Sequence, residues 1–267
     1  MTRTVASGLA LAFCGLMAGC ATPLSDLPAR IDSLLPVDIV LLGEQHDAPD
    51  HQRLQRAVVL ELARREQLAA VAMEMAEQGR STAGLARDAT DAQAQAALHW
   101  NDGVWSWSAY GPVVMAAVRN GVPVLGANLP RDAMRAAMAN TTLDTHLAPG
   151  GLDQQHANMR AGHCQLMPES QVAPMARIQI ARDAAMAHTA MAATQPGKSV
   201  LLVAGGAHVS RALGVPTHLP ASVRARTILA VAGRPDATAA SSADLLWETP
   251  ELPPRDHCAG LEQRLKK

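Results

Sequence analysis

Short runs of apolar, mostly branched residues recur along the chain and are bounded by polar or turn-forming residues. They fall at residues 39–42, 68–75, 123–127, 199–204 and 227–231, and a shorter run at 244–247 has the pattern of an edge strand. An apolar run of this kind, without polar alternation, is typical of a strand that is buried on both faces, as in a parallel sheet. The hydrophobic pattern therefore predicts a sheet that is mostly parallel.

Segments with helical character lie between these predicted strands. A helix is predicted to begin at Pro49, because proline suits the first helical turn. Its Leu54, Val58 and Leu62 then form an apolar stripe at four-residue spacing. Further helices are predicted at 78–98, at 112–120, from 130, at 169–194 and, briefly, at 209–213, whereas 148–168 and 234–242 are predicted to be irregular.

The alternation of strands and helices indicates an α/β fold. Of the 267 residues, 48% are hydrophobic and 18% are charged, which is enough apolar material for a packed core. No repeat and no linker separates two halves, so we predict a single domain with a central, mostly parallel sheet flanked by helices. The net charge of −1 and the absence of a Lys or Arg run exclude nucleic acid as a partner.

The amino terminus has the pattern of a secretory signal peptide. Arg3 precedes an apolar run at residues 5–17, which is too short to span a bilayer as a permanent helix. The small residues before Cys20 resemble the lipobox of bacterial lipoproteins, with Met17 where leucine is usual. The alternative is an ordinary secreted protein that is cleaved nearby.

The lipobox resemblance divides the chain into three parts. Residues 1–19 are then a lipoprotein signal peptide, residues 20–36 a lipid-anchored tether that begins at the lipidated Cys20, and residues 37–267 the α/β domain. Ala21 after the cysteine implies anchoring in the outer membrane of a Gram-negative bacterium, facing the periplasm.

Two cysteines, Cys164 and Cys258, lie outside the signal peptide and the lipobox. An even pair in an oxidising compartment is most simply a disulfide. Two free thiols are the alternative.

Two of the predicted strands end in the same short motif. The first is followed by Gly43-Glu44-Gln45-His46, and the strand at 199–204 is followed by Gly205-Gly206-Ala207-His208. Open α/β sheets bind ligands at the carboxyl ends of their strands, where Glu74 of the strand at 68–75 would also lie. The alternative for His46 and His208 is a pair of buried histidines that bond to the backbone.

Aromatic side chains are concentrated in one segment. Three of the four tryptophans and the only tyrosine lie within residues 100–110, and Trp105, Trp107 and Tyr110 are candidates for a ligand platform. The alternative is a cluster that covers one end of the core. Two arginines are further candidates: Arg131, near a predicted helix start, suits a carboxylate or phosphate, and Arg182 lies on a face that lines a cavity or meets solvent.

Two kinds of site are compatible with these residues. In the first, His46 and His208 bind a divalent metal such as zinc together with Glu44, and Glu44 or Glu74 acts as the catalytic base of a hydrolase. In the second, the edge binds a large flat ligand, with Tyr110 as a ligand to haem iron.

Four segments together resemble the ChaN family of haem-binding lipoproteins in the wider Tiki superfamily. They are residues 42–47, 105–112, 127–131 and 205–208. The resemblance implies a central parallel sheet, a lipid anchor, binding of haem or an iron compound, a role in its uptake, and a homodimer around the ligand as one arrangement. Tyr110 is the only tyrosine, so if it does not meet the iron, this role passes to a histidine. The superfamily also includes metal-dependent peptidases and esterase-like proteins, which makes a metal-dependent hydrolase the alternative function.

Overall fold

Six strands form one sheet in the order β3-β2-β4-β1-β5-β6, and every neighbouring pair is parallel. The computed structural model of the chain describes residues 21–265. The strands are β1 (Ile39–Glu44), β2 (Leu68–Glu77), β3 (Val124–Asn128), β4 (Ser199–Gly205), β5 (Ala225–Ala232) and β6 (Leu245–Thr249). The predicted α/β fold with a parallel sheet is therefore confirmed.

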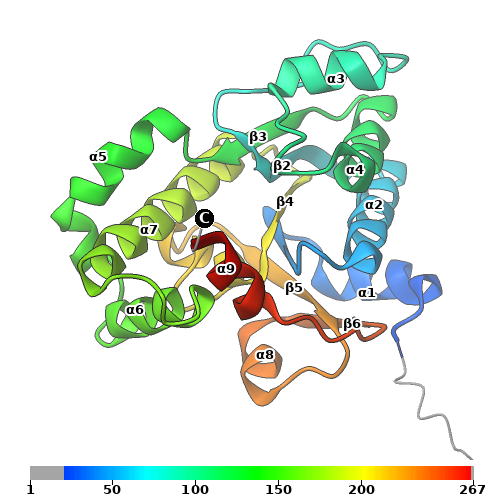
Figure 1. Cartoon of the computed structure of the whole chain (residues 1–267). Helices are drawn as coiled ribbons and strands as arrows, with labels where there is room; N and C mark the ends of the chain where they lie inside the picture. Colours follow the sequence, from blue (N-terminus) through cyan, green and yellow to red (C-terminus); the bar gives the residue numbers. More distant parts are fainter. Residues whose placement is uncertain (1–20, 266–267) are drawn as a thin grey trace, which may run out of the picture.

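Helices connect the strands and cover both faces of the sheet (Figure 1). The α-helices are α1 (Leu27–Leu34), α2 (Pro49–Arg64), α3 (Asp91–Leu98), α4 (Trp107–Arg119), α5 (Met134–Ala139), α6 (Gly151–Gly162), α7 (Glu169–Ala192), α8 (Ala237–Ser242) and α9 (His257–Leu265). Short 3₁₀ helices lie at Leu24–Asp26, Arg131–Ala133, Thr141–Thr145, Gly206–Val209 (η4) and Val215–His218 (η5). None of the described helices is long and apolar enough to cross a membrane.

The two faces of the sheet bury alternate residues of the same strands. Val40 and Leu42 of β1 pack toward α2 and α4, whereas Ile39 and Leu41 pack toward α7. Because successive side chains of a strand point to opposite faces, a strand between two helical layers must be apolar at every position. This explains why the apolar runs in the sequence show no alternation.

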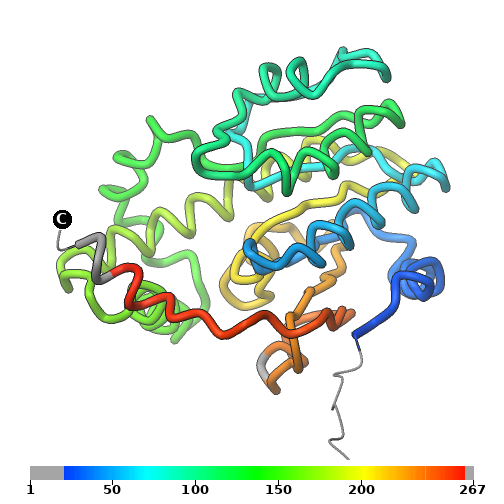
Figure 2. Tube along the Cα trace, turned by 45° about the vertical axis from the view of Figure 1, so that its right-hand side comes forward, coloured from blue at the N-terminus to red at the C-terminus, as the bar shows by residue number. Residues whose placement is uncertain are grey.

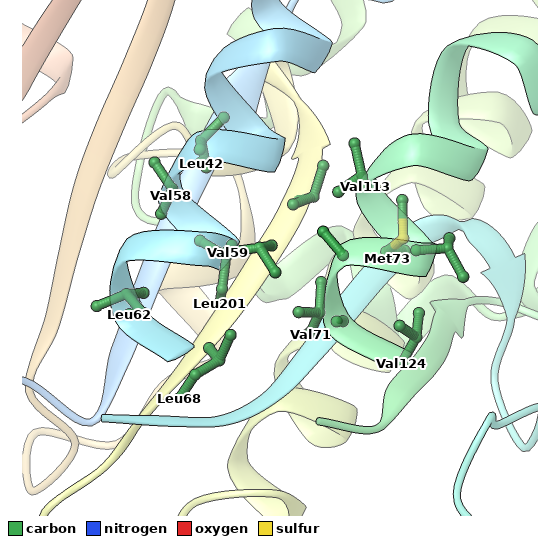
Figure 3. Packing of buried hydrophobic residues seen from close by; sticks show 14 of the residues in the cluster. Leu42, Val58, Val59, Leu62, Leu68, Val71, Met73, Val113, Val124 and Leu201 are labelled. Atoms are coloured by element: carbon green, nitrogen blue, oxygen red, sulfur yellow. The ribbon is translucent and has the colours of Figure 1, made fainter. Parts of the chain in front are cut away.

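The face under α2 and α4 carries the larger core. Figure 3 shows Val58, Val59 and Leu62 of α2 beside Leu42 and Leu201 of the central strands. Burying one such side chain contributes about 1.5–3 kcal/mol. The four-residue stripe predicted for this helix is therefore its core-facing side.

Helix α1 lies inside the segment that we assigned to a tether. Its Leu27, Ile31 and Leu34 are buried in the core with α2. Thr22 also donates its backbone N–H to the carbonyl of Glu248 on the edge strand β6, at 2.8 Å. The folded unit therefore starts at least fifteen residues before position 37, and the signal peptide and Cys20 lie outside the described residues.

Five predicted elements differ from the structure. The helix predicted at 78–98 is confined to α3, because Gly79 and Gly84 have positive φ and Thr90 forms a capping box with Gln93. The helix predicted from 112 begins at Trp107, whose backbone N–H donates to the side chain of Asp102. Helices α6 and α8 occupy segments that we expected to be irregular, and the helix expected at 209–213 is replaced by η4 and a turn.

A disulfide joins Cys164, after α6, to Cys258 in α9, as predicted. Figure 2 shows the segment after β6 running across the molecule to reach α6. Side chains from Pro253 to Gly260 are exposed, so noncovalent packing contributes little to holding this segment.

Candidate functional site

Strands β1 and β4 lie side by side, and Glu44 is in register with Gly205. From β1 the chain crosses to β2 through α2 on one face, and from β4 it crosses to β5 through η4 and η5 on the other. Such a point, where neighbouring connections leave in opposite directions, is where open α/β sheets place their ligand sites. The two Gly-x-x-His motifs therefore meet at one edge, as the sequence predicted.

Glu44 ends β1 as a buried carboxylate with several donors around it. Tyr110 Oη donates to Glu44 Oε1 at 2.6 Å, and Gln52 Nε2 donates to Oε2 at 2.8 Å. Gln55 Nε2 also donates to Oε2. Hydrogen bonds from two elements, α2 and α4, thus fix one carboxylate at the end of the sheet.

Tyr110 is 2% exposed. Burial and the neighbouring Glu44 raise the pKa of its hydroxyl well above the ordinary value. The hydroxyl therefore stays protonated and donates a hydrogen bond to Glu44, so in this structure Tyr110 positions the carboxylate.

His46 is the exposed imidazole of the site, with 40% of its side chain accessible. Its Nδ1 lies 2.8 Å from Glu44 Oε1, and because a carboxylate only accepts, Nδ1 carries the proton. The ring of Trp105 meets it edge-on at 4.8 Å between centroids. Burial lowers the pKa of His46, but Glu44 and Glu74 outweigh it and raise the pKa overall.

The loop that carries His46 is fixed by His51 in the first turn of α2. The N–H of Gln45 donates to His51 Nδ1 at 2.9 Å, and His51 Nε2 lies 3.1 Å from Thr249 Oγ1. Burial lowers the pKa of His51, so the ring is neutral and can accept from the backbone.

Next to Glu44 and His46 lies a second group of charged side chains, which consists of Glu74, His208 and Asp183. Glu74 Oε2 accepts the N–H of Gly205 at 2.8 Å, and Oε1 lies 3.4 Å from His208 Nε2. The other nitrogen of His208, Nδ1, lies 2.6 Å from Asp183 Oδ1 of α7. A buried imidazole thus lies between two buried carboxylates.

Their pKa values follow from this arrangement. Burial alone would raise the pKa of Glu74, but His208, His46 and the Gly205 N–H lower it to about 2. Burial would lower the pKa of His208, yet Glu74 and Asp183 raise it to about 10. Burial raises the pKa of Asp183 to about 6 against the opposing effect of His208. His208 is therefore a buried cation at neutral pH.

At Gly205 the backbone of β4 comes close to the side chain of His46. A Cβ on this residue would lie 2.9 Å from His46 Nε2 and 3.6 Å from Glu74 Oε2. Only glycine lets the end of β4 lie against the imidazole, which explains its place in the motif.

A cavity of about 310 Å³ opens beside Glu74 and Trp105. Its wall includes Asn128 at the end of β3, Arg131 and Arg182. The structure therefore groups eight of the predicted site residues at one edge: Glu44, His46, Glu74, Trp105, Tyr110, Arg131, Arg182 and His208.

Trp107 lies elsewhere. Its Nε1 donates to Asp91 at 2.9 Å, its ring packs edge-on against Trp100 at 5.0 Å, and it lines a separate surface hollow with Arg56 and Arg119. It stabilises the aromatic cluster from outside and does not reach the cavity, contrary to its predicted ligand-binding role.

Sequence reasoning missed several residues of the site. Gln52 and Gln55 were hidden in the helix pattern, although polar residues on the buried side of a helix are a usable signal. Asp183 lies next to Arg182, on the helix whose face was left open between a cavity and solvent, and the sequence showed no sign of its pairing with His208. Asn128 gave no signal of its own.

The predicted zinc site is not supported. Among the described residues, no group of three or more His, Cys, Asp or Glu side chains is arranged to hold a metal ion. The reason is that His208 has no free nitrogen, because its Nδ1 faces Asp183 and its Nε2 faces Glu74, and Glu74 itself accepts the N–H of Gly205. The metal-dependent hydrolase, with Glu44 or Glu74 as its base, loses its main support.

The sequence profile of the family described as "Haem-binding uptake, Tiki superfamily, ChaN" matches residues 30–219. The chain belongs to this family. The resemblance seen in the sequence motifs is thereby confirmed.

Among solved structures, the chain is similar to ChaN of Campylobacter jejuni, a structure described as showing cofacial haem binding. The two are 24% identical with a TM-score of 0.65, over 83% of this chain and 90% of that one. A weaker similarity, at 16% identity and a TM-score of 0.46, links 89% of this chain with all of the type III effector HopBA1, and no argument rests on it. No protein with a curated description matches the chain.

Proposed function

We propose that this chain binds haem in the cavity at the carboxyl edge of its sheet. Membership of the ChaN family supports the ligand class. The cavity offers Leu98, Leu129, Met134 and Trp105 to an apolar ring, with arginines at its wall. A mainly apolar cleft with a few polar groups is what a flat, amphiphilic cofactor needs.

The observation that carries this proposal is the state of His46. Its Nδ1 donates to Glu44, so Nε2 holds the lone pair when the ring is neutral. Because the pKa of His46 is raised, binding of iron at Nε2 would have to displace a proton from this nitrogen. The nearest acidic oxygen to Nε2, Glu74 Oε2, is 3.9 Å away, beyond hydrogen-bonding distance. A histidine whose other nitrogen bonds a carboxylate is the usual arrangement of a metal-binding imidazole.

We therefore propose that His46, in place of Tyr110, would hold the haem iron. The hydroxyl of Tyr110 is buried and already bonded to Glu44, and its raised pKa disfavours the tyrosinate that iron would need. The residues present fit haem through His46 for the iron and Trp105 beside it for the ring. Haem would supply an iron atom that this imidazole can bind.

Replacing His46 by alanine should weaken hemin binding by about 100-fold, since loss of an outer partner alone costs metal sites up to this factor. The measurement is a hemin titration of the purified domain, following the Soret band. The matched controls are His163→Ala, which removes a histidine that bonds within α6, and Tyr110→Phe. Both controls should keep a Soret band close to that of the wild type.

Two outcomes would contradict the proposal. If wild-type protein gave no Soret band, haem binding itself would be refuted. If the band disappeared in Tyr110→Phe and persisted in His46→Ala, the iron ligand would be Tyr110, as the sequence first predicted.

We further propose that Cys20 is lipidated and anchors the protein in the outer membrane, facing the periplasm, for a role in haem or iron uptake. The support is the lipobox-like sequence before Cys20 and the description of the family as haem-binding uptake proteins. A homodimer around the ligand belongs to the same proposal. Labelling of cells with a fatty-acid probe should mark the wild-type chain and leave Cys20→Ala unmarked; equal labelling would disprove lipidation at this residue.

A further inference from the structure

Two arginines on the cavity wall have guanidinium groups without a partner. In the part of the chain that the structure describes, the side chains of Arg131 and Arg182 make no hydrogen bond and no ion pair. Arg177, on the same helix as Arg182, differs because it bonds both carboxylate oxygens of Asp144 at 2.7–2.8 Å. Arg182 therefore differs from Arg177 in that no carboxylate of the described residues holds its guanidinium.

Arg182 is the inner of the two. It is partly buried, and its Nε is buried with no acceptor, whereas Arg131 is exposed. A buried donor that lacks a partner destabilises the protein, and more so if the group is charged. Such a cost is offset when a ligand supplies the acceptor.

Asn128 shows the same deficiency on the same wall. Its Nδ2 donates to the carbonyl of Glu74 at 2.9 Å, which fixes the amide, and its Oδ1 is buried without a donor. A water molecule shared with a ligand oxygen would satisfy it. Two polar side chains on the cavity wall, Arg182 and Asn128, thus each have a buried atom without a hydrogen-bond partner in the described part of the chain.

The acids of the cavity do not fill this role. Glu74 is compensated by His208 and by the N–H of Gly205. Glu77 accepts the backbone N–H of Arg131 at 3.3 Å. Neither is within bonding distance of the guanidinium of Arg182, so its charge is available to a ligand.

We infer that Arg182, assisted by Arg131 at the rim, binds a carboxylate of the ligand, so that the site selects an apolar ring system with ionised carboxylate groups. The inference rests on the proposed haem function and deepens it. A guanidinium presents a planar pair of N–H donors that matches a carboxylate, which makes such a contact both strong and specific. Recognition of the ring edge is then separate from ligation of the iron by His46.

This separation gives the experiment. Wild-type protein, Arg182→Met and His46→Ala are each titrated with hemin, with iron-free protoporphyrin IX and with the dimethyl ester of hemin, following quenching of tryptophan fluorescence. We expect Arg182→Met to weaken binding of hemin and of iron-free porphyrin by about 10- to 100-fold, the range of a charged hydrogen bond. His46→Ala should weaken only hemin. The ester should bind wild type and Arg182→Met equally weakly.

The controls address folding and net charge. Arg135→Met removes an exposed arginine from neighbouring α5 and should bind all three compounds as the wild type does. Arg182→Lys keeps the charge without the fork and should recover part of the loss. If Arg182→Met unfolded at the wild-type temperature and still bound hemin with wild-type affinity, the inference about Arg182 would be overturned, but the proposed function would not. Absence of any porphyrin binding by wild-type protein would overturn the proposed function and this inference with it.

Discussion

Replacing Glu74 by alanine should lower the free energy of unfolding by about 3–5 kcal/mol, the cost of removing one partner from a buried ion pair. Glu74 is 3% exposed and lies between two imidazoles, of which His208 is a buried cation. Without the carboxylate, His208 keeps Asp183 as its only near counter-ion, and the N–H of Gly205 loses its acceptor. Urea denaturation of the two proteins measures the difference.

The loss should depend on pH in a defined direction. The pKa of Glu74 is about 2 in the folded protein against an ordinary value of 4.5. Its charge therefore stabilises the fold fully above pH 4.5, and this contribution disappears as the pH falls through 2. The difference between wild type and Glu74→Gln, which keeps the shape of the side chain, should accordingly shrink on acidification.

Glu77→Gln is the matched control, because Glu77 ends the same strand but is partly exposed and bonds only the N–H of Arg131. It should change stability by less than about 0.5 kcal/mol. If Glu74→Ala were as stable as this control, the charge of Glu74 would not be needed to stabilise the buried His208 cation, and the prediction would be wrong.

Removing the disulfide by Cys164→Ser together with Cys258→Ser should lower the free energy of unfolding by about 4–5 kcal/mol, if the gain is mainly chain entropy in the unfolded state. The bond closes a loop over 94 positions that contains α7 and three strands of the sheet. Guanidinium unfolding of the oxidised wild type and the double variant gives the comparison.

The same variant should also become sensitive to proteases near its carboxyl end. The segment from Pro253 to Gly260 is exposed, and its other tie is the exposed ion pair of Arg255 with Asp47, at 3.6 Å. Such pairs contribute about 0–1 kcal/mol, so Arg255→Ala should leave both stability and protease resistance nearly unchanged. Equal resistance in wild type and double-serine variant would show that packing, and not the bond, holds α9.

The parts of the site that were predictable from sequence are those whose signals are local. An apolar run that ends in Gly-x-x-His specifies a strand and the polar residues just beyond its end, and the edge where parallel strands end is common to all of them. His46 and His208 were therefore placed together correctly. The same holds for Glu74, which interrupts an apolar strand.

The parts that were missed depend on how a helix is rotated when it packs. Whether Gln52 faces solvent or the end of β1 is decided by the fit of α2 on the sheet, which no short window of sequence contains. Tyr110 was expected to be a loop residue open to a ligand because the helix start at Trp107 depends on a contact with Asp102. Its burial, and so its bond to Glu44, results from that helix.

The hydrogen bond between Thr22 and the edge of β6 bears on how the protein would stand at a membrane. If Cys20 carries the lipid, a single residue separates the acylated cysteine from the first residue fixed to the sheet. One extended residue spans about 3.5 Å. The folded domain would then lie close against the lipid headgroups, and the short connection would restrict its orientation.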